Sequence, residues 1–493
     1  MEDFIPQRET FSRLLEFIRG PNKTIMKNML NHLKAFLLTV AAVLVFISCS
    51  EENEIKVPSG PTKTVVEVVT GYPDLSILEA ALVKYPDLIT TLSGEGSFTV
   101  FAPNNASFTN LLAAIGQTNL NDIPEDVLKS ILQYHVVATA SLKSTDLSNG
   151  TVKAVNGEDI SINVSSGVKI NSTVSVAVAD VEATNGIVHI VDAVLVNPSI
   201  KPIVGTIVAP AYFNKNFSTL IAAVKAASPS ILTTLLGNGP SNKKLTLFAP
   251  TNEAFAAAGI TSLPNRATLD AVLAYHVIDD EVLASELPSG SAAIPTLNGN
   301  FYLSNNGANG VFINARTQVV ATDIKGSNGV VHVINRTLLP PSKTIATIAS
   351  ELASGSAPQF TQLVAALVRT SGTGTDLLAA AADANANLTV FAPTDAAFQA
   401  LYTALGVNGI NDIDINTLTA VLKHHIVAGR VFSTDLKNGT AATLNGNITI
   451  NASTGTITDG QSNAATLNSN AALLNVLATN GVIHTINQVL LPQ

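Results

Sequence analysis

One eleven-residue stretch occurs three times in this 493-residue chain. The copies are Phe98-Thr-Val-Phe-Ala-Pro-Asn-Asn-Ala-Ser-Phe108, Leu245-Thr-Leu-Phe-Ala-Pro-Thr-Asn-Glu-Ala-Phe255 and Leu388-Thr-Val-Phe-Ala-Pro-Thr-Asp-Ala-Ala-Phe398. Their Phe-Ala-Pro motifs begin at residues 101, 248 and 391, which are 147 and 143 residues apart. Solenoid repeats are only about 20 to 50 residues long. The period therefore predicts three copies of a whole domain.

Each copy predicts a strand that is followed directly by a helix. The apolar residues before the proline are typical of a short strand, and the proline ends it because it cannot donate to a ladder. The next residue is Asn104, Thr251 or Thr394, which are all good helix N-caps. In two copies an acid, Glu253 or Asp395, falls in the first helical turn, where the helix dipole favours it.

Two further elements recur, and both contain a histidine. In the first, apolar residues at i, i+3 and i+4 predict a helix, with a histidine on the same face at i+7. In the second, an Asn-Gly pair leads into a strand with a histidine at its centre. Between them, Asn-Gly pairs at 156–157, 298–299 and 445–446 predict hairpins. The helix histidines are His135, His276 and His425, and the strand histidines are His189, His332 and His484.

Charge is sparse, and this excludes some partners. Only 13% of the residues are charged, the net charge is −9, and Lys and Arg are not clustered. Nucleic-acid binding needs a basic footprint, so we expect no nucleic-acid partner. The same balance argues against electrostatic docking on an anionic membrane.

The single cysteine, Cys49, follows a 13-residue apolar run, Ala35–Ile47. That length suits a signal peptide and is short for a membrane span. The segment resembles a bacterial lipoprotein signal, in which the cysteine becomes the lipidated N-terminus; a plain secretory signal is the alternative. We expect residues 26–48 to be the signal and residues 49–62 a tether. Residues 1–25 are expected to be an over-extended start, with Met26 or Met29 as better starts than Met1.

The three recurring elements, in this order, resemble the fasciclin domain. Its first signature block is similar to Thr246–Phe255, its Tyr-His motif to Tyr275-His276, and its second block to Asn328–Pro340. The resemblance implies an α+β fold, three tandem domains that are each a β-wedge packed with several helices. We expect domain one at residues 63–198, domain two at 201–341 and domain three at 342–493.

The resemblance also implies a function and candidate ligand-binding residues. The family's role is extracellular adhesion through protein or polysaccharide ligands. In animal members, an Asp-Ile pair and the Tyr-His motif are linked to integrin contact. Only domain two carries both, so Tyr275, His276, Asp323 and Ile324 are the candidates. Domain one has Asp180-Val181; domain three has Asn475-Val476, and His424 replaces the tyrosine.

Catalytic, cofactor and metal sites are not expected. Each domain offers two recurring histidines without the close spacing of a zinc site, and domain three adds only His424, whose ring points to another helix face than that of His425. No Gly-x-Ser-x-Gly nucleophile motif occurs. We therefore expect structural roles for the histidines on apolar faces, namely His135, His189, His332, His425 and His484. A polysaccharide-acting enzyme would need two carboxylates across a cleft. Because charged residues are sparse, the chain offers few candidates for such a pair.

The resulting hypothesis is a cell-surface lipoprotein that mediates adhesion by non-covalent binding. Its partner would be a cell-surface or matrix protein or a polysaccharide, and an N-terminal lipid on Cys49 would hold it in the membrane. The acidic Ser50-Glu-Glu resembles signals for the outer face of the outer membrane, so we expect it to face the exterior. The alternative is a periplasm-facing scaffold lipoprotein of the cell envelope.

Overall fold

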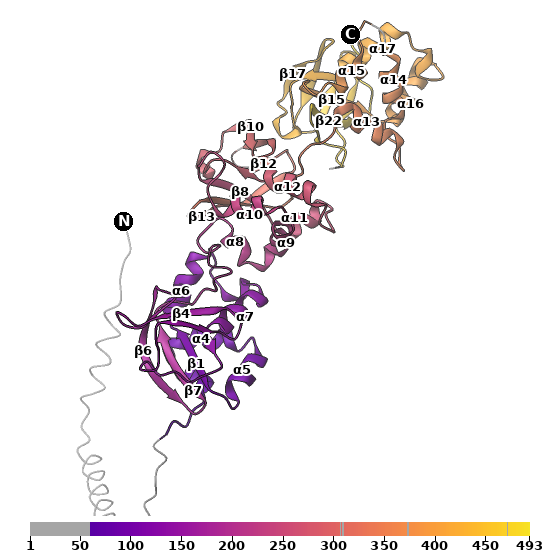
Figure 1. Ribbon diagram of the computed structural model, residues 1–493. Helices are drawn as coiled ribbons and strands as arrows, with labels where there is room; N and C mark the ends of the chain where they lie inside the picture. The colour runs from indigo at the N-terminus through magenta and orange to yellow at the C-terminus, as the bar shows by residue number, and fades with distance from the viewer. Residues whose placement is uncertain (1–59, 306, 308–309, 372–373, 471) are drawn as a thin grey trace, which may run out of the picture. The chain divides into compact units, whose positions relative to one another are not determined.

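The computed structural model describes residues 60–493, apart from residues 306, 308–309, 372–373 and 471. The predicted signal peptide, Cys49 and all but the last residues of the predicted tether lie outside the described residues. Within the described part, three domains each combine β-strands with helices on one side of the strands (Figure 1). None of the described helices is both long and apolar enough to cross a membrane.

Two parallel strands form the centre of domain one. They are β1 (Phe98–Pro103) and β7 (Gly186–Val191), paired from Phe98 opposite Gly186 to Pro103 opposite Val191. The sheet has seven strands in the order β2-β1-β7-β6-β5-β4-β3. The other strands are β2 (Val136–Val137), β3 (Gly150–Lys153), β4 (Asp159–Asn163), β5 (Lys169–Ile170) and β6 (Val174–Ala183). The first and last motifs of the repeat are therefore neighbours, although about 90 residues separate them in sequence.

Domains two and three repeat this centre. In domain two β8 (Leu245–Pro250) pairs with β14 (Gly329–Ile334), and in domain three β15 (Leu388–Pro393) pairs with β22 (Gly481–Ile486), both in parallel. The remaining strands of domain two are β9 (Val277–Ile278), β10 (Gly290–Thr296), β11 (Gly299–Asn305), β12 (Val311–Ile313) and β13 (Thr317–Gly326). Those of domain three are β16 (Ile426–Ala428), β17 (Gly439–Ala442), β18 (Asn447–Asn451), β19 (Thr456–Thr458), β20 (Ala464–Thr466) and β21 (Val476–Ala478). Because β20 and β21 together take the place of one long strand, domain three has two four-stranded sheets.

The helices pack against one face of the central strands. In domain one they are α3 (Val65–Thr70), α4 (Ser76–Leu82), α5 (Pro86–Ser93), α6 (Asn105–Ala114) and α7 (Glu125–Tyr134). Domain two has α8 (Ala209–Tyr212), α9 (Ser218–Ala226), α10 (Pro229–Leu236), α11 (Asn252–Ala257) and α12 (Arg266–Tyr275). Domain three has α13 (Ile345–Ser354), α14 (Thr361–Arg369), α15 (Leu377–Ala382), α16 (Asp395–Leu405) and α17 (Ile415–His424).

The predicted N-caps are confirmed. The side chains of Asn104, Thr251 and Thr394 accept hydrogen bonds from backbone N–H groups in the first turns of α6, α11 and α16. The prolines Pro103, Pro250 and Pro393 are the last residues of their strands. Each cap therefore satisfies one of the N–H groups that the start of a helix leaves without a partner inside the helix.

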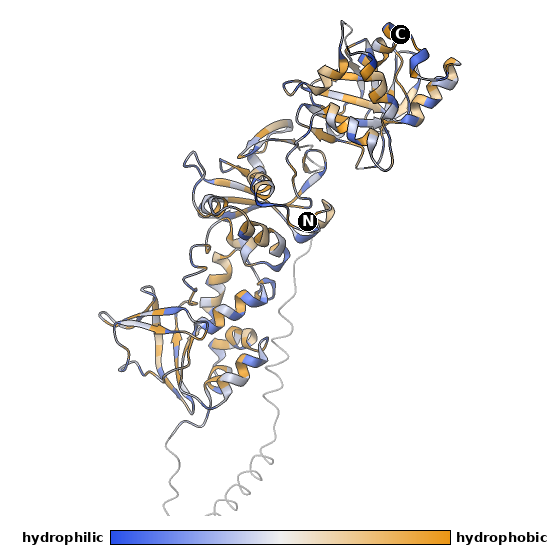
Figure 2. Cartoon of the chain, turned by 45° about the vertical axis from the view of Figure 1, so that its right-hand side comes forward, coloured by the Kyte–Doolittle hydropathy of each residue, from blue (hydrophilic) through white to orange (hydrophobic). Residues whose placement is uncertain are grey.

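All six residues of β1 are buried because the strand separates two apolar cores. Val100 and Ala102 belong to the core formed with the helices, whereas Phe101 belongs to the core formed with the hairpins. Domains two and three divide their central strands in the same way. Figure 2 shows that hydrophobic and hydrophilic residues alternate along the helices and strands. Burial on both faces is typical of parallel strands.

One glycine in each central pair is required by a close approach. A Cβ at Gly186 would lie 2.3 Å from the carbonyl oxygen of Phe98, and one at Gly481 would lie 2.1 Å from that of Leu388. At Gly329, which has a φ of 150°, the distance to the Leu245 carbonyl oxygen would be 1.9 Å. No side chain fits there unless the parallel strand moves.

Candidate functional site

The helix histidine of each domain is the C-cap residue of its helix and is buried. His276 is 1% exposed, and its Nδ1 lies 2.7 Å from the carbonyl oxygen of Val272. Its Nε2 accepts the N–H of Leu338 at 3.0 Å. Nδ1 must therefore carry the proton, and the ring is neutral. His135 and His425 make the equivalent two bonds.

Burial lowers the pKa of all three helix histidines to about 4. The charged form would lose its hydration in the apolar core, and the bond to the helix carbonyl offsets only part of that cost. The ring links the end of the helix to the chain that follows the last central strand. Its position is that of a structural cross-link.

The strand histidine of each domain holds the opposite tautomer. In domain two His332 Nε2 donates to the carbonyl oxygen of Val282 at 2.9 Å, and Nδ1 accepts the N–H of Asp323 at 3.3 Å. His189 and His484 bond in the same way. The ring also lies beside the phenylalanine of Phe-Ala-Pro, with centroids 5.3 Å apart for Phe248 and His332.

Burial lowers the pKa of His189 and His332, and it lowers that of His484 to about 4. His189 Nδ1 lies 4.0 Å from a carboxylate oxygen of Asp180. Because that nitrogen accepts the Asp180 N–H, the ring is neutral and the pair is not an ion pair.

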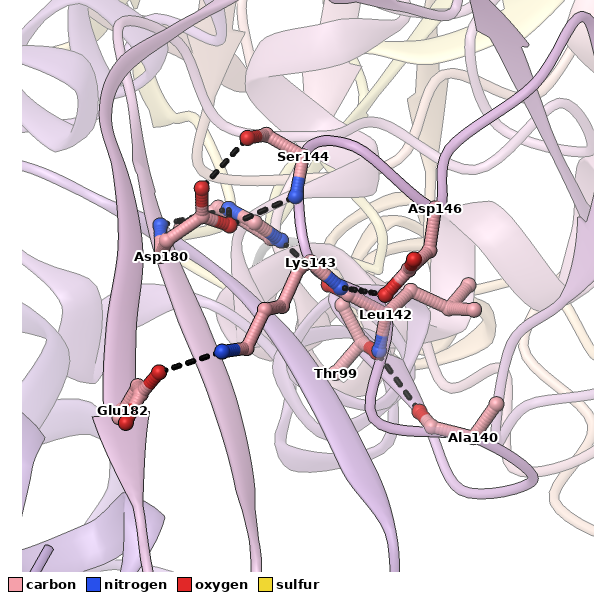
Figure 3. A network of polar contacts seen from close by, with 9 residues as sticks. Thr99, Ala140, Leu142, Lys143, Ser144, Asp146, Asp180 and Glu182 are labelled. Atoms are coloured by element: carbon pink, nitrogen blue, oxygen red, sulfur yellow. Dashed lines mark hydrogen bonds and ion pairs between the residues drawn. The ribbon is translucent and has the colours of Figure 1, made fainter. Parts of the chain in front are cut away.

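A threonine of the first repeated block completes the network. In domain one the Thr99 hydroxyl donates to the carbonyl oxygen of Ala140 at 2.7 Å and accepts the N–H of Leu142 at 2.9 Å (Figure 3). Thr246 and Thr389 make the corresponding bonds in the other domains. The threonine therefore fixes the loop whose carbonyl oxygen binds the strand histidine.

The residue that precedes Val181, Ile324 or Val476 has a backbone conformation in the left-handed region. Asp180, Asp323 and Asn475 have φ values of 61°, 60° and 54°. In domains one and two this residue lies where the ladder to the last strand shifts its register. A short polar side chain tolerates this conformation best, because it bonds locally.

The side chain at this bulge position caps the turn that follows the helix, but its environment differs among the domains. Asp180 accepts both the N–H of Ser144 at 2.6 Å and the Ser144 hydroxyl (Figure 3). Asn475 is 4% exposed, accepts the N–H of Ser433 and donates to its hydroxyl. Asp323 is exposed, and its Oδ1 accepts the N–H of Ala284 at 2.9 Å. Since Ala284 has no hydroxyl, domain two leaves the second carboxylate oxygen more open.

The four candidate ligand-binding residues fall into two groups. Asp323 is exposed and Ile324 is half-buried. Tyr275 is fully buried; its hydroxyl donates to the carbonyl oxygen of Asn300 at 2.9 Å, and burial raises its pKa to about 12. His276 is buried as described above. Of the four side chains, those of Asp323 and Ile324 can therefore be reached from the surface, and ligand contact by all four stays a prediction.

The asparagine of the last Asn-Gly pair has a role that the pattern alone did not indicate. Asn185 Oδ1 accepts the N–H of Val65 at 2.9 Å, and its Nδ2 donates to the carbonyl oxygens of Leu92 and Gly94 at 2.8 Å. Asn328 and Asn480 repeat all three bonds. The side chain joins the first helix, the end of a later helix and the last strand. The sequence feature that could have indicated this role is the presence of the same asparagine in all three copies.

The recurring polar groups thus bind one another and the backbone, which leaves them few free atoms. Within residues 60–493, apart from the gaps named above, no group of three His, Cys, Asp or Glu residues could hold a metal ion. The arrangement makes each domain a scaffold whose helices, strands and loops are cross-linked by side chains. What differs among the three copies is the set of side chains that the scaffold presents.

Comparisons with known proteins agree with this repeated architecture. The family model named Fasciclin domain matches residues 73–197, 215–340 and 358–492. Periostin from Homo sapiens is 28% identical over 451 residues, which cover 87% of this chain and 50% of periostin. Transforming growth factor-beta-induced protein ig-h3 from Sus scrofa is 27% identical over 450 residues, covering 89% of this chain and 59% of that protein. Protein sll1483 from Synechocystis sp. is 40% identical over 136 residues, covering 27% of this chain and 74% of that protein. The chain thus spans half to three-fifths of the length of the two animal relatives.

Proposed function

Because the chain belongs to the fasciclin-domain family, we propose that it is an adhesion protein that binds a protein or polysaccharide ligand non-covalently through its tandem domains. The observation that carries the proposal is the threefold match to the family model over most of the chain. Three linked copies can raise avidity without any new contact, because the second and third binding events are intramolecular.

The internal bonding of each domain also supports a binding role. The helix histidine and the strand histidine of each domain are neutral and buried, and each has both ring nitrogens bonded to the backbone. A general base must reach a proton on its substrate, and these rings do not. The recurring residues therefore serve the fold, and the surface side chains are left to recognise a partner.

We place the ligand contact of domain two at Asp323 and Ile324. Among the described residues, the Asp323 carboxylate accepts one N–H group, that of Ala284, and it does so through Oδ1. The second oxygen is open to a donor or cation that a partner supplies. In domains one and three, the corresponding side chains are held by a serine.

The location that we propose is the outer face of the outer membrane, with a lipid on Cys49 as the anchor. The apolar run before Cys49 and the acidic residues after it support this proposal. A periplasm-facing scaffold would have the same domains but would meet other envelope components and no external surface.

Protease treatment of intact cells tests the proposed function. We expect digestion of the wild-type protein on whole cells, and release or mislocalisation of a Cys49→Ala variant. Purified chain should then bind at least one surface in a panel of immobilised matrix proteins and polysaccharides. Protection of the protein until the outer membrane is opened would reject the adhesion proposal in favour of the periplasmic scaffold.

A further inference from the structure

A hollow of about 300 Å³, lined by both polar and apolar residues, lies beside the segment that joins domains two and three. Its charged lining residues are Arg316, Arg336 and Lys343, and no Asp or Glu occurs among the described residues that line it. Lys343 is balanced by Glu351, with Nζ and Oε2 2.6 Å apart. The ion pairs of the described residues include neither arginine. Two positive charges therefore face the hollow without an acidic partner.

The hydrogen bonds of these arginines leave part of their donor capacity unused. Arg316 lies in the turn between β12 and β13; its Nη2 donates to the carbonyl oxygen of Leu474 at 2.7 Å, while its Nε is buried without a partner. Arg336 follows β14 and donates through Nη1 to the carbonyl oxygen of Ala257. The hydroxyl of Thr337, which also lines the hollow, is likewise buried without a partner. A buried donor without a partner costs folding free energy.

The two guanidinium groups also repel each other. Burial lowers the pKa of Arg316, and the charge of Arg336 lowers it further. Like charges held together in a partly buried site are unfavourable. An anion between them would remove the repulsion and would accept from the unused donors.

The arginines are specific to domain two. The left-handed turn Asn314-Ala315 before Arg316 corresponds to Asn171-Ser172 in domain one, where Thr173 follows. Two residues after the last central strand, Arg336 corresponds to Ala193 in domain one and to Gln488 in domain three. Since the same fold forms with neutral residues at these positions, the arginine pair is not a requirement of the fold.

We propose that this hollow binds the carboxylate of an acidic peptide segment of the adhesion partner, an inference that rests on the proposed function. A guanidinium matches a carboxylate with two parallel N–H donors. Beside the charged residues, the lining includes apolar residues such as Pro341, Leu477 and Leu339, which is 50% exposed. An acidic residue with an apolar neighbour suits this mixture.

The charge distribution favours a peptide over a polyanionic glycan. A polyanion gains most from an extended track of cations, and here two arginines stand alone on a chain with a net charge of −9. Most charges of such a glycan would meet a surface of their own sign. A single carboxylate with apolar neighbours, in contrast, needs only the two arginines, Arg316 and Arg336, as its positive partners.

The test uses the full chain with ¹⁵N-labelled arginine and follows the Nε–H resonances by NMR. The probes are N-acetyl-Leu-Asp-Leu-amide, its Leu-Asn-Leu counterpart and a galacturonate octamer. We expect the aspartate peptide to shift the Arg316 resonance and the asparagine peptide to leave it unchanged. Arg316→Gln and Arg336→Gln should each weaken binding by about tenfold or more, as measured on the remaining arginine resonance.

Arg266→Gln is the matched control, because Arg266 is an exposed arginine of domain two that does not line the hollow. It should bind the aspartate peptide as the wild type does. Equal shifts with both peptides, or none with either, would overturn the site. Tighter binding of the octamer, lost in Arg316→Gln, would overturn the peptide in favour of a glycan. If the purified chain still adheres to a matrix surface while the peptide fails to bind, the site is wrong and the adhesion proposal stands.

Discussion

At the scale of single residues, one bulge position has three different environments. Asp180 is held by a serine through both carboxylate oxygens, Asp323 is capped through one, and Asn475 is buried. All three share the left-handed backbone and the bond to the strand histidine. The backbone role is thus common to the three domains, whereas an open carboxylate is specific to domain two.

This comparison provides a substitution that separates binding from folding. Asp323→Asn keeps the oxygen that accepts the Ala284 N–H and removes the charge, and domain three already carries asparagine at this position. We expect the free energy of unfolding to change by less than about 0.5 kcal/mol. Binding to the matrix surface identified in the panel should fall about tenfold, because the loss of one charge-assisted bond costs about 1.5 kcal/mol or more.

Chemical denaturation and surface-binding measurements on the same preparation check this prediction. Asp180→Asn in domain one is the matched control; it should leave binding unchanged, because its carboxylate is held by Ser144. Undiminished binding by Asp323→Asn would remove this residue from the ligand site.

At the scale of elements, one asparagine side chain in each domain joins three segments. In domain two, Asn328 accepts the N–H of Ile207 and donates to the carbonyl oxygens of Leu235 and Gly237. It thereby bonds the last central strand to the segment before α8 and to the end of α10. The side chain is 7% exposed, so water cannot easily replace these bonds.

Asn328→Asp should destabilise domain two by about 3 kcal/mol or more. The aspartate has nearly the same shape, but it cannot donate, and its charge would face two carbonyl oxygens in a buried site. Hydrogen exchange of domain-two peptides, followed by mass spectrometry, measures the loss. Asn300→Asp is the control, since Asn300 is exposed on β11. Similar exchange in the two variants would mean that the three bonds contribute little.

At the scale of the whole molecule, the domains differ in how many histidines have a pKa of about 4. Domain three has two, His425 and His484, whereas domain one has His135 and domain two has His276. In domains one and two the strand histidine also has a lowered pKa. Every shift has burial as its main cause, because the neutral ring is the form that the core accepts.

We therefore expect acid to destabilise domain three most steeply. Between pH 6.5 and about 4 the unfolded state binds a proton at each such histidine and the folded state does not, so stability falls as the pH falls through this window. Each histidine contributes about 3 kcal/mol over the whole window as an upper value. Above pH 7 the contribution is constant.

Hydrogen exchange at several pH values, corrected for intrinsic exchange rates, measures how the stability of each domain changes with pH. The slope of stability against pH between 6.5 and 4 should be greatest for peptides of domain three. The range from pH 7 to 9 is the internal control, where these histidines predict no slope. Equal slopes in the three domains, or stability that rises on acidification, would contradict the assignment.

Much of the fold could be predicted from repetition and local chemistry. Three spaced copies of Phe-Ala-Pro predicted three domains, and the proline followed by Asn104, Thr251 or Thr394 predicted a strand that ends at a capped helix. These predictions succeed because a cap, a turn or a helix face depends on residues within a few positions of each other.

The candidate site was harder to predict from the sequence, because its residues come from segments that are far apart in the chain. Tyr275 and His276 are adjacent, and two adjacent helix residues normally point to different faces. Here Tyr275 enters the core on the hairpin side, while His276 bonds to Leu338. Both residues are buried because the helix ends between the two cores, and this cannot be deduced from the helix alone.

The number of domains, the capped strand-to-helix joints and the apolar positions of the histidines thus follow from the amino-acid sequence. Three features became visible in the folded chain alone: β1 and β7 are parallel neighbours, Asn185 joins three segments, and Arg316 and Arg336 line one hollow. The difference arises from the distance along the chain over which each interaction acts. Local patterns are set by steric and hydrogen-bonding constraints within one turn or one strand, whereas the contacts of a long-range site depend on how complete elements pack.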